Sequence, residues 1–211
     1  MEKGLLIIMS GPSGVGKGTI RLLVMADKSL NMTYSISMTT RKPREFEKEG
    51  RDYFFVSQEE FNQYVKEGRM LEHADYVDHS YGTPKDYVEK LRNEGKNVLL
   101  EIDVKGAKQV LGKEDGLKTV SFFIVPPSLK ELERRIRSRG SEDEGTIAKR
   151  MAVAKAEIAN DKLYDYIVLN DNVQTAADLI RTTVLSIAKA GGKKPDQPKA
   201  QRLPAGFKIQ L

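Results

Sequence analysis

The chain has 211 residues, enough for one folded domain with short insertions but too few for two large independent domains. Its 35 Lys and Arg against 30 Asp and Glu give a net charge of +5, which suits anionic ligands but does not indicate a nucleic-acid groove. The absence of cysteine excludes disulfides, thiolate nucleophiles and cysteine-ligated metals. The apolar runs are too short to span a membrane and the N-terminus does not resemble a signal peptide, so we expect a cytoplasmic protein.

Four apolar runs predict buried strands. The first covers Leu5 to Met9, and a helix with Ile20, Leu23 and Val24 on one face follows it. A helical pattern also follows each later run, at Val98–Leu100, Val120–Val125 and Tyr166–Leu169. Continuous apolar runs that alternate with helices predict an α/β fold, with a mostly parallel sheet flanked by helices.

Capping patterns predict where several helices begin and end. Capping boxes begin at Ser57, Ser128 and Ser141, and Thr83-Pro84 offers an N-cap followed by a first-turn proline. Glycines that should end helices are Gly68, Gly95 and Gly140. A polar stretch before Thr83 interrupts the strand–helix alternation, so we interpret it as an insertion into the core.

A glycine-rich segment, G-P-S-G-V-G-K, lies directly between the first predicted strand and the first helix. In this context glycines let consecutive backbone N–H groups surround phosphate oxygens, and the helix N-terminus adds its dipole. A turn that only joined strand to helix would not need Lys17, whose charge suits a transferred phosphoryl group. We predict that this loop binds the phosphates of a nucleotide through Gly11, Pro12, Ser13, Gly14, Val15, Gly16, Lys17, Gly18 and Thr19.

Two details qualify the nucleotide motif. Gly18 stands where such loops usually carry a Ser or Thr that touches magnesium, and Thr19 comes one position later. Asp103-Val104-Lys105-Gly106 matches the D-x-x-G of GTPases, but the chain has no Asn-Lys-x-Asp for guanine recognition of that type. A signalling GTPase is therefore not favoured.

A second cluster of Arg and Tyr residues lies between Ser35 and Phe54. Guanidinium groups bind phosphate through two parallel hydrogen bonds and phenol hydroxyls add further ones, which is what a monophosphate acceptor needs. Together with the phosphate loop, this segment resembles guanylate kinase, and the resemblance runs from about Leu5 to Ala190. It implies a P-loop kinase core with a GMP-binding insertion and a helical lid, and direct in-line transfer of a phosphoryl group from ATP to GMP, giving GDP.

The resemblance also implies roles for residues at the acceptor site. Glu72 would read the guanine edge, because an ionised carboxylate accepts hydrogen bonds from the adjacent N1–H and N2 amino donors, a pair that adenine lacks. Asp103 would line the nucleotide site and contact magnesium-bound water, while His73 and His79 match no family role. The remaining acceptor residues are Ser37 and Thr83 beside the base, Arg41, Arg44, Tyr53 and Tyr81 on the GMP phosphate, and Glu47, which would orient this cluster by pairing with an arginine.

A run of arginines on the predicted helix from Ser128 to Arg139, and the helix after it, resembles the lid of the family. Arg135, Arg139 and Arg150 would close over ATP and the migrating phosphoryl group, whereas Arg134 and Arg137 are expected on a solvated face. Asn170 would border the adenine. We expect five residues to be catalytic: Lys17, Arg41, Arg135, Arg139 and Arg150.

The resemblance divides the chain into parts. Residues 1–35, 86–128 and 159–190 would form one discontinuous nucleotide-binding core, 36–85 the GMP-binding insertion, 129–158 the lid, and 191–211 a loosely held tail. We expect ATP and GMP or dGMP as substrates, and Mg²⁺ held mainly by phosphates and water rather than by protein ligands. The sequence leaves the oligomeric state undetermined.

Two other functions remain open from the sequence. Guanylate-kinase-like domains of scaffold proteins bind phosphorylated peptides without catalysis, but they typically lack the working phosphate loop that Lys17 completes here. A related P-loop kinase with a phosphorylated sugar as acceptor would not need a guanine reader such as Glu72.

Overall fold

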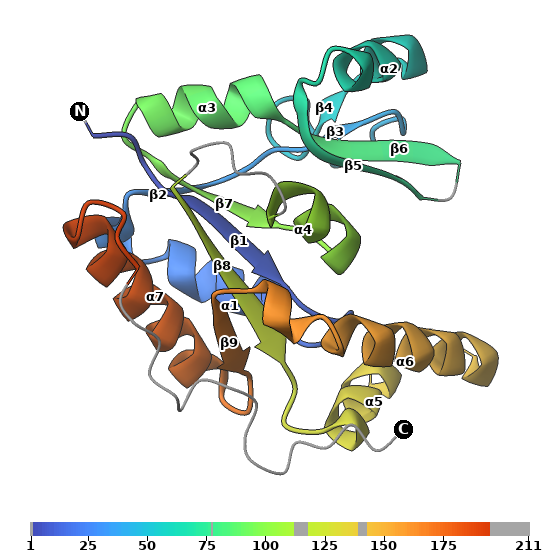
Figure 1. Ribbon diagram of the computed structural model, residues 1–211. Helices are drawn as coiled ribbons and strands as arrows, with labels where there is room; N and C mark the ends of the chain where they lie inside the picture. Colours follow the sequence, from blue (N-terminus) through green and yellow to red (C-terminus); the bar gives the residue numbers. More distant parts are fainter. Residues whose placement is uncertain (1, 77, 112–117, 139–142, 195–211) are drawn as a thin grey trace.

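A parallel five-stranded sheet forms the centre of the computed structural model, which describes residues 2–76, 78–111, 118–138 and 143–194 (Figure 1). Its strand order is β2-β7-β1-β8-β9, and every neighbouring pair is parallel. The strands are β1 (Leu6–Ser10), β2 (Met32–Tyr34), β7 (Asn97–Glu101), β8 (Thr119–Val125) and β9 (Tyr166–Leu169). The predicted α/β class and the four apolar strands are thus confirmed. The short edge strand β2 was not predicted, since it contains no apolar run.

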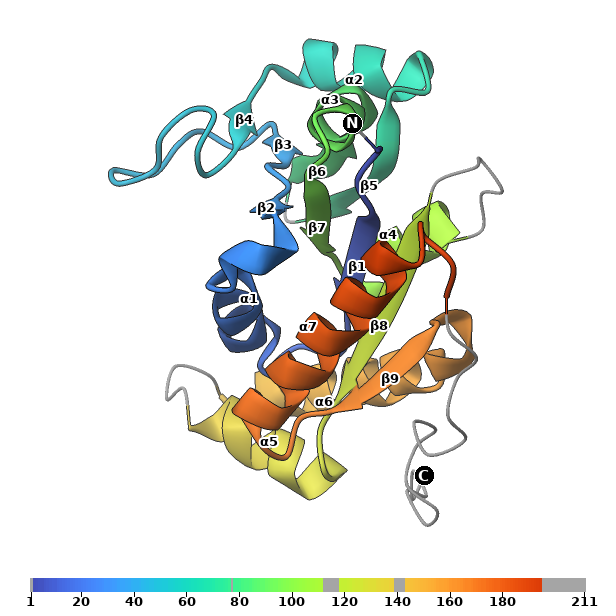
Figure 2. The ribbon, with the colours of Figure 1, turned by 90° about the vertical axis from the view of Figure 1, so that its left-hand side faces the viewer.

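Helices cover both faces of this sheet. Ile7 and Met9 of β1 pack into one core cluster with α1 (Lys17–Met25) and α7 (Val173–Lys189), which lie side by side in Figure 2. Leu6 and Ile8 face the opposite cluster, with α3 (Lys85–Asn93) and α4 (Val104–Leu111). Burial on both faces explains why β1 reads as a continuous apolar run rather than an alternating one.

A second sheet lies at one end of the molecule, beside α2 (Gln58–Lys66), and α5 (Leu129–Arg137) and α6 (Glu144–Ile158) lie at the other end (Figure 1). The strand order of this second sheet is β4-β3-β6-β5. Met38, Phe61 and Met70 form a small hydrophobic core cluster there. The strands are β3 (Met38–Thr39), β4 (Phe54–Phe55), β5 (Met70–Tyr76) and β6 (His79–Pro84). All four fall between residues 36 and 85, the segment interpreted as an insertion.

Most of the predicted helix ends are confirmed. The hydroxyls of Ser57 and Ser128 accept hydrogen bonds from the backbone N–H groups of Glu60 and Glu131, as an N-cap requires. Gly68 and Gly95 follow α2 and α3 with positive φ angles of 67° and 78°, which residues with a Cβ rarely adopt.

Two predicted N-caps differ from the structure. The prediction that Thr83 caps a helix was wrong, because Thr83 lies inside β6 and Pro84 occupies the N-cap of α3. Asp143, not Ser141, caps α6, accepting from the backbone N–H of Thr146. Ser141 itself, like Gly140, lies outside the described residues.

The rest of the described chain consists of connections. Two short 3₁₀ helices, Lys28–Leu30 and Asp161–Leu163, precede β2 and β9. At the start of the tail, the Lys194 ammonium lies 2.6 Å from the Asp165 carboxylate, and residues 195–211 lie outside the described part. In the described ranges, no helix combines the length and the apolar composition needed to cross a membrane.

Candidate active site

The predicted phosphate loop is folded into a cradle at the carboxyl end of β1. Gly11 and Gly16 have φ angles of 146° and 101°, and a Cβ added to Gly11 would lie only 2.4 Å from the carbonyl oxygen of Ile124. A larger residue would therefore push the loop away from the sheet. α1 begins at Lys17, whose Nζ donates to the carbonyl oxygens of Gly11 at 2.5 Å and Pro12 at 3.2 Å.

A cavity of about 440 Å³ and one of about 430 Å³ lie on either side of the carboxyl end of β7. The smaller one is the phosphate-loop cavity, defined by its lining of Ser13, Gly14, Gly16, Lys17, Gly18, Thr19, Arg21, Leu22 and Glu101. Six of the nine residues predicted to bind ATP phosphates line this cavity. Of the other three, Gly11 and Pro12 hold Lys17, and Val15 is buried beneath the loop.

The phosphate loop is braced from below by Asn170, which follows β9. Its side chain is 5% exposed, and Nδ2 donates to the carbonyl oxygen of Val15 at 2.8 Å. A Cβ added to Gly16 would lie 2.6 Å from this Nδ2. Asn170 was predicted to border the adenine, and this stays a prediction; in the structure its side chain supports the shape of the loop.

Two of the predicted lid arginines also contact the phosphate loop. Arg135 on α5 donates to the carbonyl oxygens of Val15 at 3.3 Å and Asn170 at 2.9 Å. Arg150 on α6 donates to the Ser13 hydroxyl at 2.8 Å. Both helices are therefore tied to the loop by side-chain hydrogen bonds. The predicted site at Arg139 lies outside the described residues.

The other two arginines of α5 were expected on a solvated face. Arg134 is 68% exposed and pairs with Glu131, and Arg137 pairs with Glu133. Both ion pairs lie on the exposed surface of α5, which agrees with that expectation.

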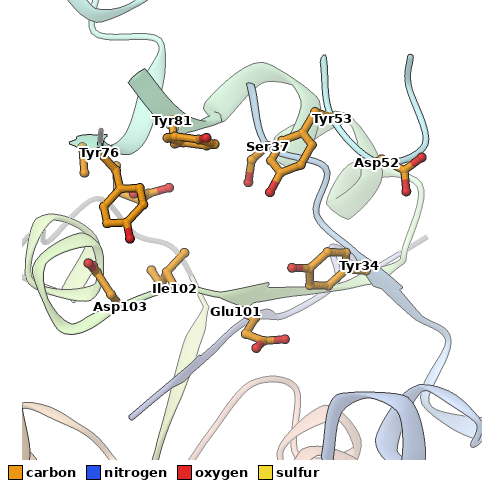
Figure 3. A pocket seen from close by; sticks show the side chains of 12 residues that line it. Tyr34, Ser37, Asp52, Tyr53, Tyr76, Tyr81, Glu101, Ile102 and Asp103 are labelled. Carbon is orange, nitrogen blue, oxygen red and sulfur yellow. The ribbon is translucent and has the colours of Figure 1, made fainter. Parts of the chain in front are cut away.

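The larger cavity, the acceptor cavity, lies between the second sheet and the carboxyl end of β7 (Figure 3). Tyr53, Tyr81 and Ser37 lie on one wall, and Tyr34 and Asp103 on the opposite wall. Five of the predicted acceptor residues line it: Ser37, Tyr53, Glu72, Tyr81 and Asp103. The sequence did not single out the other lining residues, which are Tyr34, Asp52, Ala74, Tyr76, Gly82, Glu101 and Ile102.

Glu72 is a buried carboxylate in the lining of the acceptor cavity. It is 8% exposed, and its Oε1 accepts a hydrogen bond from the Thr83 hydroxyl across the β5–β6 pair at 2.6 Å. Burial raises the pKa of Glu72, the charge of Asp103 adds to this, and the hydrogen bond from Thr83 partly offsets it. Asp103 is itself held in place by the backbone N–H of Gly106 at 2.7 Å. The cavity thus contains two fixed acceptors.

Arg41 and Glu47 form an ion pair beside Tyr53, which lines the acceptor cavity; neither Arg41 nor Glu47 is itself in that lining. Arg41 Nη2 lies 2.8 Å from Glu47 Oε1, and Glu47 Oε2 accepts from the backbone N–H of Arg44 at 2.8 Å. The pairing raises the pKa of Arg41 and lowers that of Glu47. The Arg41 guanidinium also lies 5.5 Å from the ring centre of Tyr53. Arg44 is exposed, and its side chain is not part of either described cavity lining.

Glu101 lines both cavities and was missed by the sequence reasoning. The sequence could have indicated Glu101, because ligands of parallel sheets bind at the carboxyl ends of the strands. Glu101 is the last residue of β7, two residues before Asp103. Arg21 was missed as well, although it follows Lys17 by one turn of α1 and so lies on the same helix face.

The phosphate-loop cavity has two side chains, Thr19 and Glu101, whose oxygen atoms fit a magnesium ion that is bound mainly by substrate phosphates. Among the described residues, no group of three or more His, Asp or Glu could hold a metal ion. Mg²⁺ in kinases is usually bound by one or two carboxylates together with substrate phosphates and water. Glu101 and the Thr19 hydroxyl line the cavity and could supply such oxygens, directly or through water.

Comparison with known proteins agrees with this geometry. The family model for guanylate kinase matches residues 3–186. A guanylate kinase of Bacillus subtilis is 51% identical over 186 residues, covering 88% of this chain and 90% of the relative. One of Malacoplasma penetrans is 50% identical over 183 residues, covering 85% and 92%. The crystal structure of guanylate kinase from Anaplasma phagocytophilum superposes with a TM-score of 0.65 at 32% identity, covering 92% of this chain and 89% of that one. The chain therefore belongs to the guanylate kinase family.

Proposed function

We propose that this protein catalyses the transfer of the terminal phosphoryl group of ATP to GMP, giving ADP and GDP, and that it acts in the cytoplasm. The observation that carries the proposal is the pair of cavities that share Glu101: one lies at the phosphate loop, and the other contains the buried carboxylate of Glu72. The names of the relatives, all guanylate kinases, support the same reaction.

The acceptor cavity would select guanine by hydrogen bonding. The carboxylate of Glu72 accepts from the N1–H and N2 amino groups of the base, and Thr83 keeps one of its oxygens in position. Asp103 and the Ser37 hydroxyl complete the polar lining around the base. Since this recognition uses the base and the phosphate, we expect dGMP to be accepted too.

The phosphate of GMP would bind at the mouth of the same cavity. Arg41, Tyr53 and Tyr81 are gathered there, with Arg41 held by Glu47. A guanidinium fork and two phenol hydroxyls suit a phosphate dianion. Arg44, on the exposed loop beside them, would join when residues 36–85 close over the nucleotide.

Catalysis would rest on positioning and charge rather than on a covalent intermediate. The attacking oxygen of GMP is already anionic, so no general base is needed, and the incoming oxygen and the leaving ADP oxygen lie in line. Lys17, Arg135 and Arg150 supply positive charge where negative charge redistributes, and Mg²⁺ bound to the phosphates adds to it. The lid, residues 129–158, would exclude water as it closes on the core formed by residues 1–35, 86–128 and 159–190.

The experiment that tests this function is a coupled assay for ADP release with GMP, dGMP, AMP and UMP as acceptors. We expect turnover with GMP and dGMP and at least about a thousandfold lower kcat/KM with AMP, since a missing donor pair leaves buried acceptors unpaired. No turnover with any acceptor, together with binding of phosphorylated peptides, would instead indicate a scaffold domain. Turnover with AMP or UMP that equals or exceeds turnover with GMP would overturn the assignment of Glu72.

A further inference from the structure

Arg21 lies at the boundary between the two cavities. It lines the phosphate-loop cavity from α1, on the same helix face as Lys17, four residues earlier. Its Nε is 3.5 Å from Oε2 of Glu101, the residue that lines both cavities. The guanidinium is thus next to the place where the phosphates of two nucleotides must meet.

Three residues form what we term the boundary cluster: Arg21, Tyr34 and Glu101. The Arg21 guanidinium lies 4.3 Å above the ring centre of Tyr34, and Tyr34 lines the acceptor cavity beside Glu101 (Figure 3). Burial raises the pKa of the Tyr34 hydroxyl, and the charge of Glu101 adds to this. Each member comes from a different element, α1, β2 or β7. Arg21 lines the phosphate-loop cavity, Tyr34 lines the acceptor cavity, and Glu101 lines both.

The ion pair within this cluster is loose enough to be exchanged for a ligand. Its separation of 3.5 Å exceeds the roughly 2.7–2.9 Å of a strong charge-assisted hydrogen bond. Both side chains keep some contact with solvent, with 27% of Arg21 and 20% of Glu101 exposed. A phosphate oxygen that arrives at the boundary could therefore bind the guanidinium while the carboxylate stays in place behind it.

Gly18 leaves open space on the same helix face, three residues before Arg21. A Cβ added there would meet no described heavy atom within 4 Å. Phosphate loops usually carry a hydroxyl side chain at this position; Gly18 offers none, and Arg21 is the next residue on this helix face.

We propose that Arg21 is an additional catalytic residue, which binds a phosphate oxygen at the boundary of the two cavities once both nucleotides are present, and that Glu101 positions it there. This inference rests on the proposed function. A contact that strengthens as the phosphoryl group moves between the two cavities stabilises the transition state more than the complex with both substrates, and this raises kcat. Arg21 thus supplies charge between the two polyanions.

The test uses a ligand that spans both cavities, adenosine joined to guanosine through five phosphates. Its affinity, and those of GMP alone and of a non-hydrolysable ATP analogue alone, are measured by calorimetry for the full chain and for Arg21→Gln. We expect the spanning ligand to bind about 10-fold to 100-fold more weakly to the variant, as for the loss of one charged hydrogen bond. Each single nucleotide should stay within about threefold, and kcat should fall by a factor similar to that of the spanning ligand.

A matched control is Arg69→Gln. Arg69 also lies over a tyrosine ring, 4.0 Å from that of Tyr64, and pairs with Asp86 at 2.6 Å, but it belongs to neither described cavity lining. All affinities should be unchanged in this variant. Melting temperatures show that each variant is folded, and Arg21→Lys, which keeps the charge without the fork, should give an intermediate loss if Arg21→Gln does not fold.

Other outcomes would overturn the proposal. Unchanged affinity for the spanning ligand in Arg21→Gln, or equal losses for that ligand and for one single nucleotide, would mean that Arg21 does not act at the boundary. Full recovery in the double variant Arg21→Gln, Glu101→Gln would mean that Arg21 only neutralises Glu101. If the wild-type protein binds the spanning ligand but phosphorylates no GMP, the proposed function fails while the affinity test of Arg21 still stands.

Discussion

Replacing Glu72 by Gln tests whether this buried carboxylate selects guanine or supports the fold. The Thr83 hydroxyl can still donate to the Gln carbonyl oxygen, in place of Glu72 Oε1. The other carboxylate oxygen becomes an NH₂ group, which is a donor that meets the donors of guanine. The variant therefore keeps the internal hydrogen bond and removes only the acceptor that faces the ligand.

The expected loss follows from these hydrogen bonds. A hydrogen bond to a charged group contributes about 1.5–3 kcal/mol, and a buried donor left unpaired costs about 1–3 kcal/mol more. Together these losses of about 2.5–6 kcal/mol predict that kcat/KM for GMP falls by about 70-fold to 25,000-fold. The KM for ATP should not change, and the ratio of kcat/KM for GMP to that for AMP should fall.

The same substitution that lowers kcat/KM for GMP should not lower the free energy of unfolding at neutral pH. The pKa of Glu72 is raised in the folded protein, so ionising it costs free energy that the unfolded chain does not pay. The contribution of protonated Glu72 to the free energy of unfolding is fully present below the pKa of this residue in the unfolded chain. It is lost as the pH rises through the pKa in the folded protein. At neutral pH, Glu72→Gln should therefore have a free energy of unfolding equal to or greater than that of the wild type, and this gain should vanish in acid.

Urea unfolding at two pH values and the coupled ADP assay measure both effects. Glu60→Gln is the control for activity, because Glu60 is an exposed glutamate of the same segment, in the first turn of α2, and should leave kcat/KM for GMP unchanged. The reasoning is refuted if Glu72→Gln keeps kcat/KM for GMP within threefold of the wild type, or if it lowers stability at neutral pH.

Three further predictions concern the same site. Thr83→Val removes the hydrogen bond that lowers the pKa of Glu72, so the fall of kcat/KM for GMP on acidification should begin at a higher pH than in the wild type; coincident pH profiles would contradict this. Lys17→Ala should abolish transfer, lowering kcat by at least about a thousandfold, while circular dichroism stays native; near-normal turnover would refute its role. Asn170→Ala removes the brace under Val15 and should weaken binding of an ATP analogue by about 5-fold to 30-fold, as expected for about 1–2 kcal/mol, while calorimetry shows unchanged binding of GMP; equal losses for both ligands would exclude a local effect on the phosphate loop.

The features that could be predicted from the sequence are those determined by residues that are neighbours along the chain. Leu5 to Met9 can be buried on both faces only in a covered sheet, and the glycines and Lys17 after it are needed only by a phosphate loop. Ser57 and Gly68 mark helix ends through bonds and dihedral angles that involve their own neighbours. The acceptor residues came from a resemblance to a family, since no local pattern distinguishes Glu72 from a surface glutamate.

Tertiary structure alone decided which distant residues share a cavity. Thr83 looked like a helix cap, but the pairing of β5 with β6 turns its hydroxyl toward Glu72. Asn170 supports the phosphate loop because β9 ends beneath it, 155 residues away in sequence from Val15. Glu101 meets both cavities because parallel strands end at one edge of the sheet. Such contacts depend on strand order and register, which arise from packing over the whole chain rather than from the preferences of neighbouring residues.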